Sequence, residues 1–385
     1  MKKTTCIASL MVCLSMGQAG ALAQNIRIDM NKTYPEKTIS LQKVADVKYI
    51  PLETTDEVLF NGVVTHLSAE GIAGFNKKEG DILVFDGTGK AIASFNHTGQ
   101  GPNEYNKIYH LDVDWKQKEV YVQDNFRQKI RIYALNGSHL RTIDLQETMQ
   151  QGDLYNFSDT HLIYYAQPKS KPVTAYEPVT LLSKKDASKV TLPFTKTDDN
   201  LVKATGGPFG DMKMSAKNVN LLCKKGDEVY VNEVTADVIY RVESNHALTP
   251  VVERTPSYQD ASGQDFFLML TGANARYYFF KRQQALLEFQ GNAATDTKST
   301  YVAYDRKEKQ LLNPTFTNED YPSQDIPMSK LLQCAGSANR CYLQLEAFKL
   351  KEALAEGKLK GTLKSIAEKL DEEDNPVLMV VEFKK

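Results

Sequence analysis

The chain has 385 residues, in which 47 Lys and Arg side chains balance 48 Asp and Glu side chains. Because these charges are interspersed along the sequence, we expect neither a nucleic acid nor an obligatory anionic membrane surface as a partner. The hydrophobic share of 42% is that of a chain with a packed core and not of a disordered one.

Residues 1–23 are predicted to be an export signal. Two lysines give a positive start, residues 7–14 form a short, mostly apolar run, and the Ala-Leu-Ala of residues 21–23 matches a signal-peptidase site. The run is shorter than the ~20 residues that span a bilayer, and no later run approaches that length, so no transmembrane segment is expected. We therefore predict export to the periplasm or the cell surface, with residues 24–385 as a single domain.

A β-hairpin pattern recurs along the remaining chain. Residues 81–95 read as an alternating strand, a turn and a second strand, and residues 129–143 repeat this pattern 48 positions later. Gly89 falls on Gly137 in this comparison, at the turn position that favours a positive φ. A weaker third copy covers residues 179–194. The recurrence indicates a repeat built from strands alone.

The best-preserved repeat unit contains four strand candidates within about 40 residues, which is typical of one blade of a β-propeller. We therefore predict an all-β fold, a six-bladed β-propeller of four-stranded antiparallel blades. A β-sandwich with accidental hairpin similarity is the alternative. The four candidates are residues 109–115, 119–123, 129–135 and 139–145, and weaker copies at 228–248, 301–312 and 341–345 bring the blade count to between five and seven.

Three later segments depart from the repeat. The aromatic-rich residues 257–291 are predicted to be buried strands of a late blade with longer loops. Residues 349–371 have leucines at helical spacing, which predicts a short helical excursion broken near Gly357 and Gly361. Residues 375–383 read as a strand, and we expect it to pair with an N-terminal strand, either residues 26–30 or 47–52, so that the ring has no open edge.

Four segments carry a family resemblance: Tyr-Ile-Pro-Leu-Glu-Thr at residues 49–54, the strand and turn at 82–90, Gly-Gln-Gly-Pro-Asn-Glu-Tyr at 99–105, and residues 372–378. They resemble a secreted six-bladed β-propeller family of Gram-negative gut anaerobes, itself similar to NHL-repeat propellers. The resemblance covers most of the chain after the signal and implies the fold and an export route. It implies no activity, because the family has no settled biochemical function and offers no catalytic residue to carry over.

The Gly-x-Gly-Pro segment that begins at Gly99 is the sharpest local motif. A phosphate-binding loop needs a strand before it, a helix after it and usually a Lys-Ser/Thr pair, but a strand candidate follows here. We interpret the segment as a linker from the outer strand of one blade to the inner strand of the next.

Four side chains are candidates for an axial channel. His66 and His110 lie near inner-strand candidates, although none of the six histidines forms a pair with metal-ligand spacing. Asp112 and Asp114 alternate along one inner-strand candidate and are expected to face the same side. Packing or solvation is the competing interpretation for all four.

Acids that end strands are a second group of candidates. Asp124-Asn125, Glu233 and Asp86 could supply the hard oxygen ligands that calcium prefers. Alternatively, each side chain accepts hydrogen bonds from the backbone of its own turn, which requires no coincidence and is the favoured interpretation.

Cysteine and aromatic residues leave further alternatives open. Cys334 and Cys341 flank a turn-like stretch and could form a disulfide or remain two thiols, while Cys223 is expected to be a small core residue. Trp115 and the 19 tyrosines could stack on sugar rings or simply pack in strands.

Two functions from different classes fit the sequence. The favoured one is a non-catalytic binding or scaffold module of the cell envelope, with a protein or a glycan-related ligand as its unknown partner. The alternative is a metal-dependent hydrolase or lyase, similar to lactonase-type propellers, with its site in the axial channel. No cofactor is expected, and the sequence does not indicate catalytic residues, metal ligands or the oligomeric state. Three or more inward Asp, Asn, Glu or His side chains around one centre would favour the enzyme.

Overall fold

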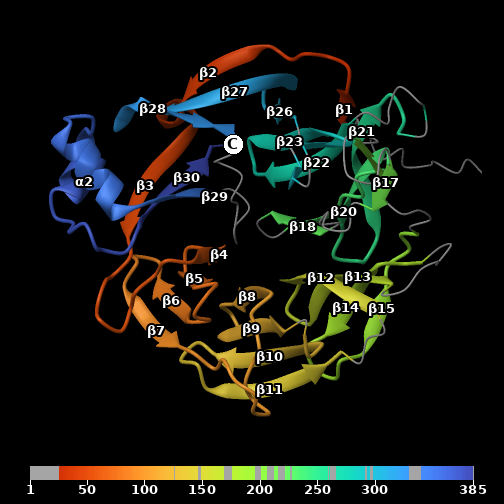
Figure 1. Ribbon diagram of the computed structural model, residues 1–385, viewed down its shortest axis with the longest axis horizontal. Helices are drawn as coiled ribbons and strands as arrows, with labels where there is room; N and C mark the ends of the chain where they lie inside the picture. The colour runs from red at the N-terminus through yellow and green to blue at the C-terminus, as the bar shows by residue number, and fades with distance from the viewer. Residues whose placement is uncertain are drawn as a thin grey trace, which may run out of the picture.

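Short β-sheets stand around a central axis in the computed structural model (Figure 1). It describes residues 26–384 except 125, 146–148, 169–175, 196–200, 206–211, 216–221, 226–227, 259, 261–265, 291–292, 295–297 and 329–339. Six of the sheets are blades, and strand follows strand from the axis to the rim, so that the predicted six-bladed fold is confirmed.

The first two blades have the four antiparallel strands that the repeat predicts. Their second strands are buried along their whole length because neighbouring blades cover both faces of each sheet, whereas the rim strands are partly exposed. Blade 1 comprises β4 (Val63–Leu67), β5 (Gly71–Phe75), β6 (Ile82–Asp86) and β7 (Ala91–Phe95), and blade 2 comprises β8 (His110–Asp114), β9 (Glu119–Asp124), β10 (Lys129–Ala134) and β11 (His139–Asp144).

Blades 3 and 4 follow the same order but are separated by an excursion. Blade 3 comprises β12 (Met149–Asn156), β13 (His161–Pro168), β14 (Val179–Ser183) and β15 (Lys189–Thr191), and blade 4 comprises β18 (Leu222–Lys225), β19 (Glu228–Val231), β20 (Val238–Val242) and β21 (Leu248–Thr255). An additional sheet, which the repeat does not predict, contains β16 (Leu201–Thr205), β17 (Met212–Ser215), β24 (Leu286–Gln290) and β25 (Ala293–Ala294).

The last two blades include the late aromatic segment and the C-terminal strand. The predicted buried strands of residues 257–291 are confirmed as the first two strands of blade 5. Blade 5 comprises β22 (Phe266–Ala273), β23 (Tyr277–Gln284), β26 (Ser299–Asp305) and β27 (Gln310–Asn318), which also pairs with β28 (Tyr321–Pro327); blade 6 comprises β29 (Arg340–Leu345), β30 (Val377–Phe383) and β3 (Ala45–Pro51).

The N-terminal segment runs along the rim over blades 4, 5 and 6 in turn (Figure 1). Strand β1 (Ile26–Asp29) pairs in parallel with β21, and β2 (Glu36–Ser40) pairs in parallel with β27. After the short helix α1 (Leu41–Val44), strand β3 pairs antiparallel with β30. Of the two candidates for closing the ring, residues 47–52 are therefore correct, and residues 26–30 add to blade 4 instead.

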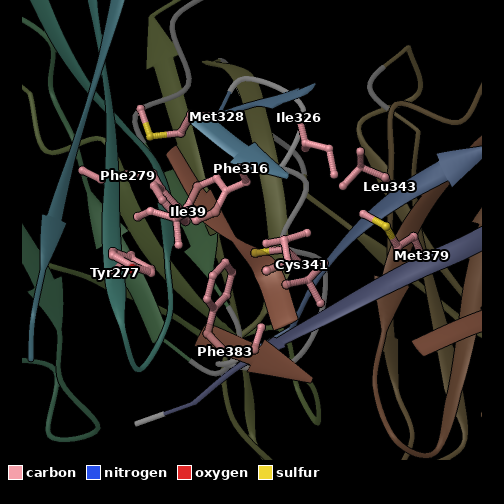
Figure 2. Packing of buried hydrophobic residues seen from close by; sticks show 14 of the residues in the cluster. Ile39, Tyr277, Phe279, Phe316, Ile326, Met328, Cys341, Leu343, Met379 and Phe383 are labelled. Carbon is pink, nitrogen blue, oxygen red and sulfur yellow. The ribbon is translucent and has the colours of Figure 1, made fainter. Parts of the chain in front are cut away.

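A cluster of aromatic and sulfur-containing side chains fills the contact between blades 5 and 6 (Figure 2). Phe279 of β23, Phe316 of β27 and Phe383 of β30 pack with ring centroids 6.0 to 6.2 Å apart. Cys341 is buried in the same cluster. Cys334 lies outside the described residues, so both alternatives for this pair, a disulfide or two thiols, stay open.

Glycines in the turns before the rim strands bring each blade against the preceding one. Gly89 and Gly137 have φ values of +92° and +86°, as their alignment predicts. A Cβ on Gly137 would lie 2.6 Å from Cγ of Phe95, at the end of the preceding blade's rim strand. In blades 3 and 4 the corresponding turns use Ala187 and His246 at positive φ, which is why those copies of the repeat are weaker.

A helical hairpin lies between β29 and β30, as the leucine spacing predicts. It consists of α2 (Ala347–Ala355) and α3 (Gly361–Ala367), with Gly357 at a φ of +68° between them. The buried face of the hairpin packs against Tyr49 of β3, so the hairpin covers the outside of blade 6.

Candidate functional site: a charged cluster on the axis

The inner strands of four blades meet at the carboxylate of Asp112. This residue lies in the middle of β8, where a side chain of blade 2 faces its neighbours, and only 3% of it is exposed. The strands that contribute contacts are β4 of blade 1, β12 of blade 3 and β18 of blade 4. Elements far apart in the sequence therefore converge on one acid.

Both oxygens of Asp112 are fully engaged. Oδ1 lies 3.0 Å from Nδ1 of His66 and accepts a hydrogen bond from the backbone N–H of Val113 at 2.8 Å. Oδ2 accepts hydrogen bonds from Nζ of Lys224 at 2.8 Å and from the backbone N–H of Asn156 at 2.7 Å. One carboxylate thus joins blade 2 to blades 1, 3 and 4.

The surroundings of Asp112 favour its charged form. Burial by itself raises the pKa of a carboxyl, but the Lys224 ammonium and the His66 ring outweigh burial and hold the pKa of Asp112 well below its usual range. Asp112 is therefore an anion at neutral pH. Such a group suits electrostatic pairing, and it is poorly suited to act as a general acid near neutrality.

Asp114 is the second acid on β8, and it forms a separate set of buried contacts. Its Oδ2 accepts a hydrogen bond from Nζ of Lys184 at 2.6 Å, and its Oδ1 accepts one from the backbone N–H of Gln117. The Lys184 ammonium also lies 5.4 Å from the centroid of the Tyr121 ring. Asp112 and Asp114 both contact blade 3, which confirms that they face the same side.

The two candidate histidines have different environments. His66 is buried in the axial cluster, and its ring lies 6.2 Å from the ring of Trp115. His110 is not part of the cluster, since its ring packs edge-on against Tyr155 with centroids 5.0 Å apart. The indole Nε1 of Trp115 is buried and has no hydrogen-bond partner among the described residues. Trp115 is partly buried and packs against the hydrophobic cluster between blades 1 and 2.

The donor set of the axial cluster does not fit a divalent cation. Within the described parts of the chain, no group of three or more His, Cys, Asp or Glu residues is placed to hold a metal. The Asp112 carboxylate already has an ammonium 2.8 Å away, and this positive charge would repel a second cation. The metal-dependent alternative therefore gains no support from these residues.

The acids at strand ends bond to their own turns. Asp86 accepts hydrogen bonds from the backbone N–H groups of Thr88 and Lys90, at 2.8 and 3.0 Å. Glu233 accepts one from Thr235 in the same way, and Asp124 accepts one from Arg127. This bonding is the favoured interpretation of the sequence. The neighbouring Asn125 lies outside the described residues.

The Gly-x-Gly-Pro segment connects β7 to β8, as the linker interpretation predicts. Oε2 of Glu104 accepts a hydrogen bond from the N–H of Gly101 at 2.6 Å. The guanidinium of Arg127, in the turn after β9, donates to the carbonyl oxygens of Gly99, Gly101 and Glu104. The loop is therefore fixed from inside by one acid and one arginine.

Two lysines of the site were not among the candidates that the sequence indicates, because those candidates were acids and histidines. Lys224 lies on the inner strand β18, and Lys184 lies in the turn after β14. Lys224 follows Leu222-Cys223 in a stretch that is typical of a core strand. Because a lysine is seldom buried without a partner of opposite charge, its position in such a strand indicates a buried ion pair.

A ring of six antiparallel blades, with a buried ion pair across its axis, defines the class as a six-bladed β-propeller. The chain belongs to the family of the domain of unknown function DUF4934, which matches residues 25–382. No curated protein matches the sequence. No helix among the described residues is long and apolar enough to cross a membrane.

Solved structures with a similar fold come from several bacteria. A Bacteroides fragilis protein inferred to be exported has 15% identity and a TM-score of 0.59, over 94% of this chain and 99% of that one. A DUF4221 family member from Bacteroides vulgatus has 8% identity and a TM-score of 0.49, over 89% and 98%. Virginiamycin B lyase from Staphylococcus aureus has 8% identity and a TM-score of 0.41, over 87% and 98%. Identities this low relate the folds alone.

Proposed function

We propose that the protein is an exported, non-catalytic binding or scaffold module of the cell envelope. The observation that carries this proposal is the state of the axial charges. Asp112 has all its contacts within the protein, and Asp114 is paired with Lys184. Paired charges inside the ring stabilise its geometry, and neither Asp112 nor Asp114 is poised to act on a substrate as an acid or base.

The proposed export rests on the first residues and on one relative. The positive start, the short apolar run and the Ala-Leu-Ala of residues 21–23 form a signal-peptidase pattern. The similar Bacteroides fragilis protein is itself inferred to be exported. Fractionation of the producing cells, followed by N-terminal sequencing of the protein, tests this part; a chain that still begins at Met1 in the cytoplasm would contradict it.

Because the charges on the axis are paired with one another, we expect the protein to bind its partner through its loops. The loop from the rim strand β7 to the inner strand β8 is fixed by Arg127 and Glu104. Preorganised loops lose little conformational entropy when a partner binds.

The test measures retention and chemical change together. Purified protein is incubated with isolated envelope material, and both the bound fraction and any newly released fragments are quantified by mass spectrometry. We expect saturable retention without fragment release. Fragment release that disappears in the Asp112→Asn variant would instead identify an enzyme with an axial site.

A further inference from the structure

Exposed aromatic rings are few in this protein, and two of them share one end of blade 2. Most tyrosine and phenylalanine side chains of the described residues are buried or half-buried in the blades. Tyr109, Phe126 and Phe348 are the aromatic side chains with large exposure in the described part of the chain, at 49%, 74% and 52%. Phe348 lies on α2, away from the other two (Figure 1).

The backbone places Tyr109 and Phe126 at the same end of the sheet. Tyr109 immediately precedes the inner strand β8, and its N–H donates to the carbonyl of Gln123 near the end of β9. Phe126 lies in the turn from β9 to β10. Leu59, 56% exposed, occupies the corresponding loop before β4 in blade 1. The apolar surface at this end is therefore mainly aromatic.

The base under these two rings is rigid. Asp124, at the end of β9, is fully buried and accepts hydrogen bonds from Nη1 of Arg131 at 3.2 Å and from the N–H of Asn106 at 2.8 Å. The hydroxyl of Tyr133 donates to the carbonyl of Asn103 at 2.6 Å. Together with the Arg127 contacts, these bonds hold the loop of residues 96–108 beside the turn that carries Phe126.

The polar surface of the same loop is rich in amides. Gln100, Asn103 and Asn106 are exposed, and so is Lys107, whereas the acid within this loop, Glu104, is bonded to Gly101. Exposed aromatic faces beside amide donors and acceptors match a pyranose ring, which has an apolar C–H face and a rim of hydroxyl groups. A protein interface usually has a larger apolar core, whereas among the described residues the exposed large apolar side chains at this end are Tyr109, Phe126 and Leu59.

We propose that this end of blade 2, formed by Tyr109, Phe126 and the loop of residues 96–108, binds a glycan by stacking of pyranose rings on the two aromatic side chains. The inference rests on the proposed binding function and names its ligand class and its surface. The fixed loop supplies the preorganisation, and the amide side chains supply hydrogen bonds to the sugar hydroxyls.

Affinity electrophoresis through gels that contain soluble β-glucan, xylan, mannan or amylopectin tests the proposal. We expect at least one polysaccharide to retard the unmodified protein, and Phe126→Ala and Tyr109→Ala each to weaken that interaction by roughly tenfold. Phe126→Tyr should retain it. Phe348→Ala removes a ring of similar exposure on α2 and should change nothing.

Three results of the gel assay would overturn the assignment: no retardation by any of these polysaccharides, retardation that both alanine variants leave unchanged, or an equal loss in Phe348→Ala. Because each substitution is at an exposed side chain, we expect all variants to fold. Circular dichroism and thermal melts check this. If envelope retention depends on Phe126 but is abolished by protease treatment of the envelope and not by glycosidases, the partner is a protein. The glycan assignment then fails while the binding module stands; fragment release, by contrast, would contradict the binding module itself.

Discussion

Asp112 and Lys224 show how a buried charge is tolerated at the centre of this ring. The side chains of the pair are only 4% and 11% exposed, so each charge has lost most of its contact with water. Each charge replaces the lost water with the opposite charge of its partner. Asp112 also accepts hydrogen bonds from two backbone N–H groups and lies beside a histidine. Removing one member leaves the other as an uncompensated buried charge.

We therefore expect Asp112→Asn to lower the free energy of unfolding by about 3 to 5 kcal/mol. Lys224→Met should destabilise less, because Asp112 retains His66. The double variant should be more stable than the sum of the single changes predicts, which urea unfolding of all four proteins measures. Arg27→Ala, which breaks an exposed pair with Glu253, serves as the control and should cost about 1 kcal/mol or less. Strict additivity of the two axial changes would contradict the pairing.

The contact between successive blades at Gly137 is close enough to be tested by adding one methyl group. Gly137→Ala adds a methyl group 2.6 Å from Phe95 at a φ of +86°, so the cost of overpacking, about 1 to 3 kcal/mol, adds to the cost of the left-handed backbone. Gly357→Ala is the matched control, because its φ is +68° and no atom lies within 4 Å of the added methyl group. Thermal melts should show a clearly larger loss for Gly137→Ala. Equal losses would mean that backbone conformation alone fixes this glycine.

At the scale of elements, the N-terminal strands are part of the core although they lie on the rim. Ile28 of β1 is completely buried, in a cluster with Tyr230, Ile239 and Val252 of blade 4. By contrast, Ile92 of the rim strand β7 is 48% exposed. Strand β1 therefore stabilises the fold through buried apolar surface as well as through backbone pairing.

We expect Ile28→Ala to cost about 2 to 5 kcal/mol, as for other buried aliphatic side chains, and Ile92→Ala to stay within about 0.5 kcal/mol. Both changes remove the same atoms from a strand at the rim of a blade, so their difference isolates burial. Denaturant unfolding measures both, and comparable effects would show that β1 is only loosely attached.

The elements also show which parts of the fold were predictable. Hairpins with local turns leave alternation and glycine signals in the sequence, so the strands of blade 2 were predicted almost to the residue. Parallel pairing leaves no such local signal. The additional sheet, in which Lys203 of β16 faces Leu286 of β24, and the pairing of β1 with β21 depend on contacts between distant segments. Sequence periodicity could not indicate them.

The axial site was predictable only in part, for a related reason. Asp112 and His66 attract attention because acids and histidines do chemistry, and both are in the cluster. Lys224 completes the cluster from blade 4, and a lysine in a sequence is usually an exposed residue. Its role depends on ring closure, which brings β18 across the axis from β8. Partners joined only by the tertiary fold therefore had to come from the structure.

For the whole molecule, several paired or hydrogen-bonded acids predict loss of stability in acid. The pKa of Asp112 is held low by Lys224 and His66 against the effect of burial, and Asp86 and Asp186 also have lowered pKa values, with that of Asp186 at about 2. These acids bind protons more readily in the unfolded chain than in the folded one. Their contribution is therefore present above the unfolded pKa values near 4 and is lost as the pH falls below them.

The melting temperature should accordingly decrease steeply as the pH falls from about 4 to about 2. In Asp112→Asn, which has no carboxyl to protonate on the axis, the decrease over this interval should be shallower. Parallel thermal melts of the two proteins across this range measure the difference. Identical slopes would show that protonation of Asp112 does not contribute to acid unfolding.

The position of β30 has a consequence for the order in which the molecule can be built. A ribosome makes β3 near the beginning of synthesis and β30 near the end, yet β30 lies between β29 and β3 and joins them into blade 6. The early strands β1, β2 and β3 must therefore wait for partners that do not yet exist, with their apolar side chains uncovered. Such a nascent chain is expected to need a chaperone or fast synthesis to avoid aggregation. The last strand to be synthesised is the one that closes the ring.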